Sequence, residues 1–430
     1  MIKQILNNPI LRVFSFNSII VIGKVFSSFV VSKVSAIYLG PTGFAIVGNF
    51  KNVLQGILGI TSSGFQSGVI RHIAENKNNK QQSSLIITSV FGLSLFLSLL
   101  IAPFVYFFSD TLSISILNES SYAFIFKYLA ICLPLISFNF LLLYIINGLQ
   151  KIKLFTIISI VFNALNAVLT FLLIHFFNLK GALIVSLIVP VISFLASFLF
   201  KEVRVLFSDQ FFTLKKISVT IVKSISVYLF MAVYSTVLIS MTYLLIRNKI
   251  IAGIDIETAG LWEGMNKIST FYMLVFTSLL TLYLLPKLAE NKTINGYKAI
   301  MTDYFKFVMP SMLVLFAVVF LFRILIINLF LTKSFLELGN FFHLQLIGDF
   351  IKVVAFSLAY QFHAKRIIIP YFISDAILYG SFYLICVFLL DTYQLSGVYY
   401  AYICSLVLYL LTVVTFIYLT RNKYLQENVQ

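Results

Sequence analysis

The amino-acid sequence predicts an all-α integral membrane protein with about twelve transmembrane helices. Hydrophobic residues make up 60% of the 430 residues and charged residues only 11%, whereas a soluble chain carries about a quarter charged residues. The mean hydropathy is +1.01, which leaves too few polar side chains to cover a water-soluble surface. The apolar runs are also long enough for helices that cross a bilayer, each of which needs ~20 residues.

A transmembrane helix is predicted wherever such a run lies between two polar breaks. The runs do not alternate polar and apolar residues, as membrane-spanning β-strands do. The expected spans are 13–38, 44–70, 83–108, 122–147, 154–177, 181–200, 217–245, 258–286, 300–327, 338–363, 367–390 and 396–420.

The basic residues between these runs predict that both termini are cytoplasmic. Segments on the side of the N-terminus hold most of them, and the opposite side holds only Lys180, Arg247, Lys249 and Lys333. Because Lys and Arg concentrate in cytoplasmic loops, this asymmetry sets the orientation and requires an even number of spans. The net charge of +16 therefore reflects topology and does not indicate a nucleic-acid partner.

The loops are too short to hold a soluble domain, since the longest cover 71–82 and 201–216. Any binding site must then lie within the membrane-embedded body. No cofactor is expected, and no His, Cys, Asp or Glu cluster has metal-ligand spacing. A membrane enzyme of glycan assembly is one alternative, but the short loops and the lack of a catalytic carboxylate set argue against it. We expect that the chain is not an enzyme.

Two halves of the chain are related at an offset near 216 residues. Gly48 and Lys51 in the second span correspond to Gly264 and Lys267 in the eighth. We expect six spans, a basic linker and six more spans, in two domains over 1–205 and 206–430. Because each half has an even number of spans, the repeats are parallel and related by an axis along the membrane normal.

Six charged residues lie deep within the predicted spans, where each costs about 2.5–3.5 kcal/mol unless it has a partner or a wet cavity. They are Lys24, Lys51, Lys267, Lys352, Glu263 and Asp349. Glu263 and Lys267 are four residues apart, and Asp349 and Lys352 are three apart, so each couple can pair on one helix face. Such pairs either only help helices assemble or belong to a water-filled cavity, whose excess of lysines would attract an anionic diphosphate.

Uncharged polar residues gather on the same or neighbouring spans and are candidates for the lining of such a cavity. For any one of them, a hydrogen bond between helices is the alternative role. The candidates are Asn49, Asn52, Gln55, Asn139, Asn163, Asn166 and Gln345.

Five stretches carry a resemblance to a known family. They read YLGPTGFAIVGNFKNVLQGILGI (38–60), GVIRHIAE (68–75), AGLWEGMNKISTFYM (259–273), SLLTLYLLPKLAE (278–290) and QLIGDFIKVVAFSLAY (345–360). In their order and spacing the chain resembles the Wzx polysaccharide flippases of the MOP exporter superfamily, in the WzxE-like branch for O-antigen or enterobacterial common antigen. The resemblance extends along nearly the whole chain and depends on the combination of stretches.

The resemblance implies two six-helix bundles that form a V with a central cationic cavity. The implied substrate is an undecaprenyl-diphosphate-linked oligosaccharide, an O-antigen unit or a related surface polysaccharide repeat. It would move from the cytoplasmic to the periplasmic face of the bacterial inner membrane by alternating access. The substrate-binding lysines would be Lys24, Lys51, Lys267 and Lys352, although Lys267 departs from the small polar residue expected in a close relative.

Glu263 and Asp349 would serve for coupling or ion pairing. Membrane lipid surrounds such a protein, and a polysaccharide polymerase and a chain-length regulator are the implied protein partners. A drug antiporter of the same superfamily is the nearer alternative. Efflux of cations favours a negative cavity, however, whereas the intramembrane charges here are mostly positive.

Overall fold

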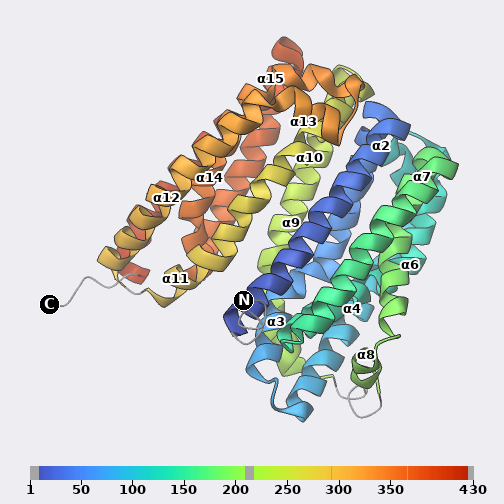
Figure 1. The fold of residues 1–430 in the computed structure, drawn as a ribbon, viewed down its shortest axis with the longest axis vertical. Helices are drawn as coiled ribbons and strands as arrows, with labels where there is room; N and C mark the ends of the chain where they lie inside the picture. Colours follow the sequence, from blue (N-terminus) through green and yellow to red (C-terminus); the bar gives the residue numbers. More distant parts are fainter. Residues whose placement is uncertain (1–8, 209–216, 292, 366, 425–430) are drawn as a thin grey trace. The chain divides into compact units, whose positions relative to one another are not determined.

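The computed structural model describes residues 9–208, 217–291, 293–365 and 367–424, and these form a helical protein (Figure 1). Among the described residues, eight helices are long and apolar enough to cross a membrane. The protein is therefore an all-α, multi-pass membrane protein, as the sequence predicts. The eight are α2 (Pro9–Thr61), α4 (Lys80–Phe107), α6 (Ala123–Gly148), α7 (Ile152–Ser197), α9 (Val219–Gly253), α12 (Ile294–Leu321), α14 (Phe342–Lys365) and α15 (Ile368–Tyr424).

Three of these long helices contain a break, and each break separates two predicted spans. The backbone leaves the helical region at Gly40 in α2, Asn178 in α7 and Gln394 in α15, with φ of 59°, 47° and 49°. A further helix, α10 (Ile256–Leu279), continues through a π-helical turn, η4 (Leu280–Leu284), into α11 (Leu285–Glu290). Together these three elements cover the predicted eighth span. The total of twelve spans and the cytoplasmic termini stay predictions.

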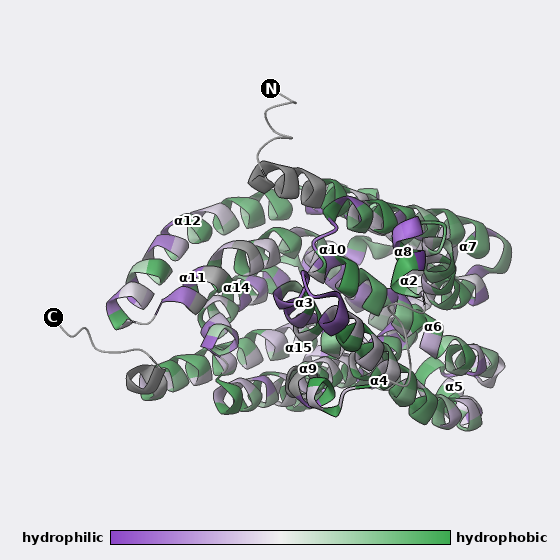
Figure 2. Cartoon of the chain, turned by 90° about the horizontal axis from the view of Figure 1, so that it is seen from below, coloured by the Kyte–Doolittle hydropathy of each residue, from purple (hydrophilic) through white to green (hydrophobic). Residues whose placement is uncertain are grey.

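The second predicted span is too long at its C-terminal end. Helix α2 ends at Thr61, because a 3-10 turn, η1 (Ser63–Phe65), interrupts the chain before α3 (Gln66–Glu75). Figure 2 shows α3 as largely hydrophilic. Its Arg71 donates a hydrogen bond to Glu75 over 2.7 Å, and this bond lowers the pKa of the Glu75 carboxyl. The remaining short helices are α5 (Ser109–Leu117), α8 (Lys201–Leu206), α13 (Arg323–Phe330), η2 (Ser120–Tyr122) and η5 (Lys333–Asn340).

By its contacts the chain divides into two compact units. Unit 1 comprises Met1–Leu39 and Ile46–Ser240, and unit 2 comprises Gly40–Ala45 and Met241–Gln430. Helix α6 packs on α4 and α7 in unit 1, and α14 packs on α15 in unit 2. The first part of α9 belongs to unit 1 because it packs tightly on α2, where a Cβ atom on Gly59 would lie 2.9 Å from the Thr236 side chain. This division groups residues by their contacts and does not test the domain boundaries expected from the sequence. The domains over 1–205 and 206–430 therefore stay a prediction.

The helix breaks support the internal repeat. Asn178 and Gln394 are 216 positions apart, the offset that relates the two halves of the sequence. A close backbone approach follows each of them. A Cβ atom on Gly181 would lie 1.9 Å from the carbonyl oxygen of Leu173, and one on Gly397 would lie 2.5 Å from that of Leu389. Both glycines are required because no side chain fits at these contacts.

Candidate functional site

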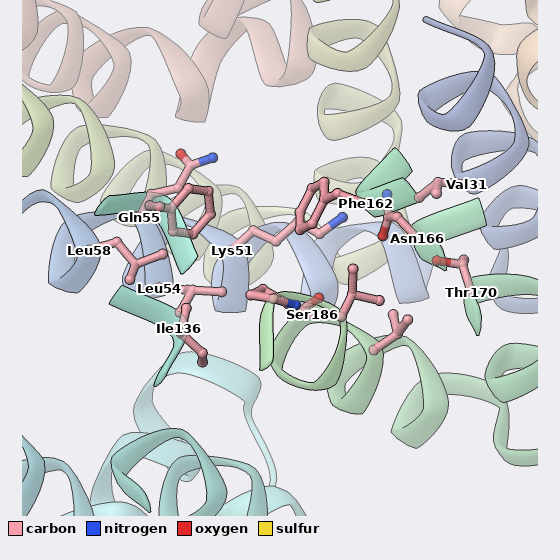
Figure 3. A pocket seen from close by; sticks show the side chains of 14 residues that line it. Val31, Lys51, Leu54, Gln55, Leu58, Ile136, Phe162, Asn166, Thr170 and Ser186 are labelled. Carbon is pink, nitrogen blue, oxygen red and sulfur yellow. The ribbon is translucent and has the colours of Figure 1, made fainter. Parts of the chain in front are cut away.

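A partly open cavity of about 240 Å³ lies in unit 1 between α2, α6 and α7 (Figure 3). Of the described residues that line it, Lys51 is the charged one, and four others are polar. The apolar part of the wall comes from aromatic and aliphatic side chains and one proline. The lining residues are Val31, Lys51, Leu54, Gln55, Leu58, Ile136, Phe140, Phe162, Asn166, Thr170, Val185, Ser186, Val189 and Pro190.

Three predicted site residues meet at this cavity. Lys51 and Gln55 are four residues apart on α2 and therefore share a helix face. In Figure 3 the Lys51 side chain extends beside Phe162 toward Asn166 of α7. The Asn166 amide donates a hydrogen bond to the Ser27 hydroxyl over 3.3 Å. A lysine with amides around it provides hydrogen-bond donors and one positive charge to a polar ligand.

The other predicted lining residues lie outside this cavity. Asn49 is fully buried and donates to the carbonyl oxygen of Ile116 over 2.9 Å, which ties α2 to α5. Asn139 on α6 is 1% exposed. Asn52 and Asn163 are half-buried. Asn49 thus forms a hydrogen bond between helices, which was the alternative to lining a cavity. For Asn52, Asn139 and Asn163 the lining role stays a prediction.

The ion pair expected between Glu263 and Lys267 is not the one that forms. Glu263 on α10 instead accepts a hydrogen bond from the guanidinium of Arg247 on α9, and the Arg247 side chain is fully buried. The reason is the turn between the two helices. Helix α9 ends at Gly253 and α10 begins at Ile256, so residues at similar distances from that turn face each other. Arg247 was expected in an outer loop, but α9 runs on past the predicted end at residue 245.

Aromatic rings complete the surroundings of Arg247. Its guanidinium carbon lies 5.5 Å from the centroid of the Trp262 ring, within range of a cation–π interaction. Trp262 in turn stacks on Tyr243, with ring centroids 5.3 Å apart. The charges of Arg247 and Glu263 thus neutralise each other inside a packed core, which satisfies the requirement that buried charges be paired.

Asp349 on α14 is the centre of a buried hydrogen-bond network in unit 2. It is fully buried, and its two oxygens accept hydrogen bonds from four side chains of α10, α14 and α15. Ser269 donates over 2.7 Å, Gln345 over 3.1 Å and Tyr402 over 2.8 Å, and Tyr272 donates the fourth. Asp349 makes no salt bridge with Lys352 within the described residues. The network joins three helices and accounts for the charge without a cation.

The other lysines lie at different places. Lys352 lines a narrow pocket of about 20 Å³ in unit 2, with its amine 5.6 Å from the centroid of the Phe356 ring. Lys24 on α2 is exposed, and Lys267 on α10 is half-buried. Within the described part of the chain, none of these three lies within 4.0 Å of a carboxylate oxygen. They are positive charges without an acidic partner there.

The sequence reasoning missed Arg247, Ser269, Tyr272 and Tyr402. Arg247 could have been found from its position in the sequence. It precedes the Ile254–Asp255 turn by almost as many residues as Glu263 follows it. Ser269 and Tyr272 are three residues apart on α10, so they share a face. Tyr402 lies on α15, far from Asp349 in the sequence, and no local pattern pairs them.

The comparisons with known proteins identify the family. Residues 10–292 match the family described as "Polysaccharide biosynthesis protein". This chain belongs to that family. As a member of the polysaccharide biosynthesis family, it is similar over almost its full length to the Lipid III flippases of Escherichia coli (strain K12) and Shigella flexneri. Each is 22% identical over 389 residues, which cover 90% of this chain and 92% of the relative.

Solved structures show the fold of this family member. An inward-facing multidrug resistance MATE family transporter of the MOP superfamily superposes with a TM-score of 0.77 at 17% identity, and covers 93% of this chain and 96% of its own. A second solved structure is a MOP superfamily transporter from Pyrococcus furiosus, described as having a binding pocket of reversed polarity. It superposes with a TM-score of 0.66 at 16% identity, and the match covers 93% of this chain and 95% of its own. The fold is that of the MOP superfamily. The named relatives are flippases and transporters, which supports the prediction that this chain is not an enzyme.

Proposed function

We propose that this protein is a flippase for an undecaprenyl-diphosphate-linked oligosaccharide, an O-antigen unit or a related surface polysaccharide repeat. It moves its substrate from the cytoplasmic to the periplasmic face of the bacterial inner membrane by alternating access. The observation that carries the proposal is the end-to-end similarity to Lipid III flippases, which covers 90% of this chain. The family match to polysaccharide biosynthesis points the same way.

The charges inside the membrane support an anionic substrate. Glu263 is neutralised by Arg247, and Asp349 is held by hydroxyl and amide donors. The lysines keep their positive potential, because Lys24, Lys267 and Lys352 have no carboxylate within 4.0 Å among the described residues. These three side chains attract a diphosphate, which ammonium groups bind as point charges, and Lys51 adds positive charge at the cavity.

The drug antiporter is the second candidate, since MATE transporters share the fold. Export of organic cations needs carboxylates that are available to the substrate. Here both intramembrane carboxylates of the predicted site already accept hydrogen bonds from protein groups. The occupied state of Glu263 and Asp349 favours the flippase. The lipid-linked glycan is the proposed partner, and a polysaccharide polymerase and a chain-length regulator are the proposed proteins that act after it.

Genetic complementation tests the proposed function. The gene is expressed in strains that lack the flippase for the common antigen or for an O-antigen unit, and surface glycan is read on a gel. We expect surface glycan to return in at least one background, with loss of the lipid-linked intermediate that accumulates without a flippase. Unchanged accumulation in every background, together with increased resistance to cationic drugs, would favour the antiporter instead.

A further inference from the structure

The cavity of unit 1 has a counterpart in unit 2 at the repeat offset of 216 residues. The second pocket is lined by Lys352, Phe356, Leu378, Phe382, Tyr402 and Leu406, together with Tyr243 and Tyr379. The first six correspond at that offset to Ile136, Phe140, Phe162, Asn166, Ser186 and Pro190 of the unit 1 cavity. The same helix positions thus enclose about 240 Å³ in unit 1 and about 20 Å³ in unit 2.

Side-chain size explains the difference. In unit 2, Phe382 packs against Tyr402 and Tyr243, with ring centroids 5.6 and 6.2 Å apart, and these rings occupy the space. The corresponding residues of unit 1 are Asn166, Ser186 and Ser27. The fold therefore does not require an open cavity at this place. Small polar residues open it in unit 1 alone.

One polar group on the cavity wall has no hydrogen-bond partner among the described residues. Thr170 lines the cavity and is 1% exposed, and its hydroxyl oxygen makes no hydrogen bond within the described residues. Buried hydroxyls are normally hydrogen-bonded to protein or to water. An unpaired hydroxyl costs about 1–3 kcal/mol. This oxygen exposes less than 1 Å², so a polar molecule in the cavity would remove the cost by pairing with the hydroxyl after the side chain turns about its Cα–Cβ bond.

Both hydrogen-bond donors and hydrogen-bond acceptors lie around Thr170 on the cavity wall. Ser186 donates its hydroxyl proton to the carbonyl oxygen of Ala182 over 3.1 Å, so its oxygen is left to accept. One N–H of the Asn166 amide donates to Ser27, which leaves the second N–H as a donor and the amide oxygen as an acceptor. Lys51 supplies donors, and Gln55 supplies donors and an acceptor. A phosphate only accepts hydrogen bonds, so the Ser186 oxygen would oppose it. A sugar hydroxyl both donates and accepts.

The apolar wall and the volume also suit a sugar. Phe140, Phe162 and Pro190 offer flat apolar surfaces to the carbon face of a ring. The cavity has a volume of about 240 Å³. It is smaller than the ~300–1,000 Å³ pockets of drug-sized ligands. One sugar ring is the unit of a glycan that matches this scale.

We propose that the unit 1 cavity binds one pyranose ring of the translocated glycan and so selects which glycan is carried. This inference rests on the proposed flippase function. Lys51 and Gln55 donate to ring hydroxyls or to an N-acetyl oxygen, Thr170 and Ser186 complete the hydrogen bonds, and Phe162 contacts the carbon face of the ring.

Filling the cavity with the side chains of unit 2 tests the proposal. The variants are Ser186→Tyr and Asn166→Phe, with Ile188→Tyr as the matched control, since Ile188 is exposed on the same helix and does not line the cavity. Each purified protein is titrated with two probes in a calorimeter. One is the repeat-unit oligosaccharide released from its lipid carrier, and the other is undecaprenyl diphosphate without sugar.

We expect both filled variants to bind the free oligosaccharide at least tenfold more weakly than wild type, and to bind undecaprenyl diphosphate within threefold of wild type. The control binds both probes as wild type does. Thr170→Val removes one hydroxyl at almost constant volume, so it tests the site even where a filled variant fails to fold. We expect it to weaken oligosaccharide binding by threefold or more.

Three results overturn the inference. If the filled variants no longer bind undecaprenyl diphosphate but still bind the oligosaccharide, the cavity is a phosphate site. If they bind both probes as wild type does, the cavity is no part of the binding site. If wild type binds undecaprenyl diphosphate but not the oligosaccharide, the sugar site is wrong and the flippase proposal stands. Failure of wild type to bind either probe would count against both.

Discussion

Arg247 and Glu263 form a buried ion pair between two consecutive helices, with the Arg247 side chain fully buried and that of Glu263 12% exposed. Removing one partner of a buried pair leaves the other charge without compensation, which costs about 3–5 kcal/mol. We therefore expect Glu263→Ala to lower the unfolding temperature of the detergent-solubilised protein strongly. The control is Glu257→Ala, which removes an exposed carboxylate from the first turn of the same helix.

A double variant separates the pair's structural role from other roles. Replacing Arg247 and Glu263 together with Met and Leu removes both charges and keeps apolar volume, so most of the lost stability should return. An unfolding temperature of the Glu263→Ala variant equal to that of the control would contradict this account of the pair.

The Asp349 network predicts a graded loss of stability. The Asp349→Asn variant keeps the size of the side chain but turns an NH₂ group toward one or more of the four donors. Tyr402→Phe removes a single hydrogen bond. Hydrogen bonds to a charged group contribute about 1.5–3 kcal/mol each, so Asp349→Asn should lower the unfolding temperature well beyond the fall seen for Tyr402→Phe. Equal stability of Asp349→Asn and wild type would show that the carboxylate is not the centre of the network.

The helix breaks predict stabilising substitutions. Asn178 and Gln394 adopt φ of 47° and 49°, and a non-glycine residue in such a conformation stores about 1–3 kcal/mol of strain. Glycine adopts it without a Cβ clash but loses about 0.5–1 kcal/mol of backbone entropy. We expect Asn178→Gly and Gln394→Gly to raise stability by about 1 kcal/mol each in thermal unfolding. The control Ala164→Gly, in the regular part of α7, should lower the stability. Lower stability in all three variants would contradict backbone strain at Asn178 and Gln394.

Replacing a glycine by alanine at a close backbone contact should destabilise the protein. A Cβ atom on Gly260 would lie 1.7 Å from the carbonyl oxygen of Pro41, so α10 meets the chain at Pro41 backbone to backbone. The Gly260→Ala variant must separate these segments, and we expect it to be poorly expressed or to unfold at a much lower temperature. Gly380→Ala is the control, because a Cβ atom there meets nothing within 4 Å. Similar behaviour of the two variants would exclude the close approach.

Much of the helical arrangement could be predicted from the sequence because lipid imposes a simple rule of length and apolarity. The breaks at Asn178 and Gln394 lie in the short gaps expected after residues 177 and 390. The end of α2 could not be placed, because Ser62 and Ser63 are small and common in transmembrane helices. Their hydroxyls bond back to the carbonyl oxygen of Leu58, and only the structure reveals this.

The candidate site was predictable in its residue types but not in its contacts. Lys51, Gln55 and Asn166 do meet at one cavity, because polar residues in apolar helices must face something polar. The partner of Glu263 depended on the length of α9 past residue 245. The partners of Asp349 come from three helices, and Tyr402 lies too far along the chain for any helical spacing to relate it to Asp349. Cavity size depends on side chains from three helices at once, which no periodicity encodes.

Transport in proteoliposomes tests the central claim most directly. Vesicles of the purified protein are loaded with labelled undecaprenyl-diphosphate oligosaccharide, and its arrival in the outer leaflet is followed with a membrane-impermeant reagent. Wild type should move this lipid much faster than protein-free vesicles do, and Lys51→Ala should slow it at least tenfold. A rate equal to that of protein-free vesicles, with the protein folded and correctly inserted, would contradict the assignment as a flippase.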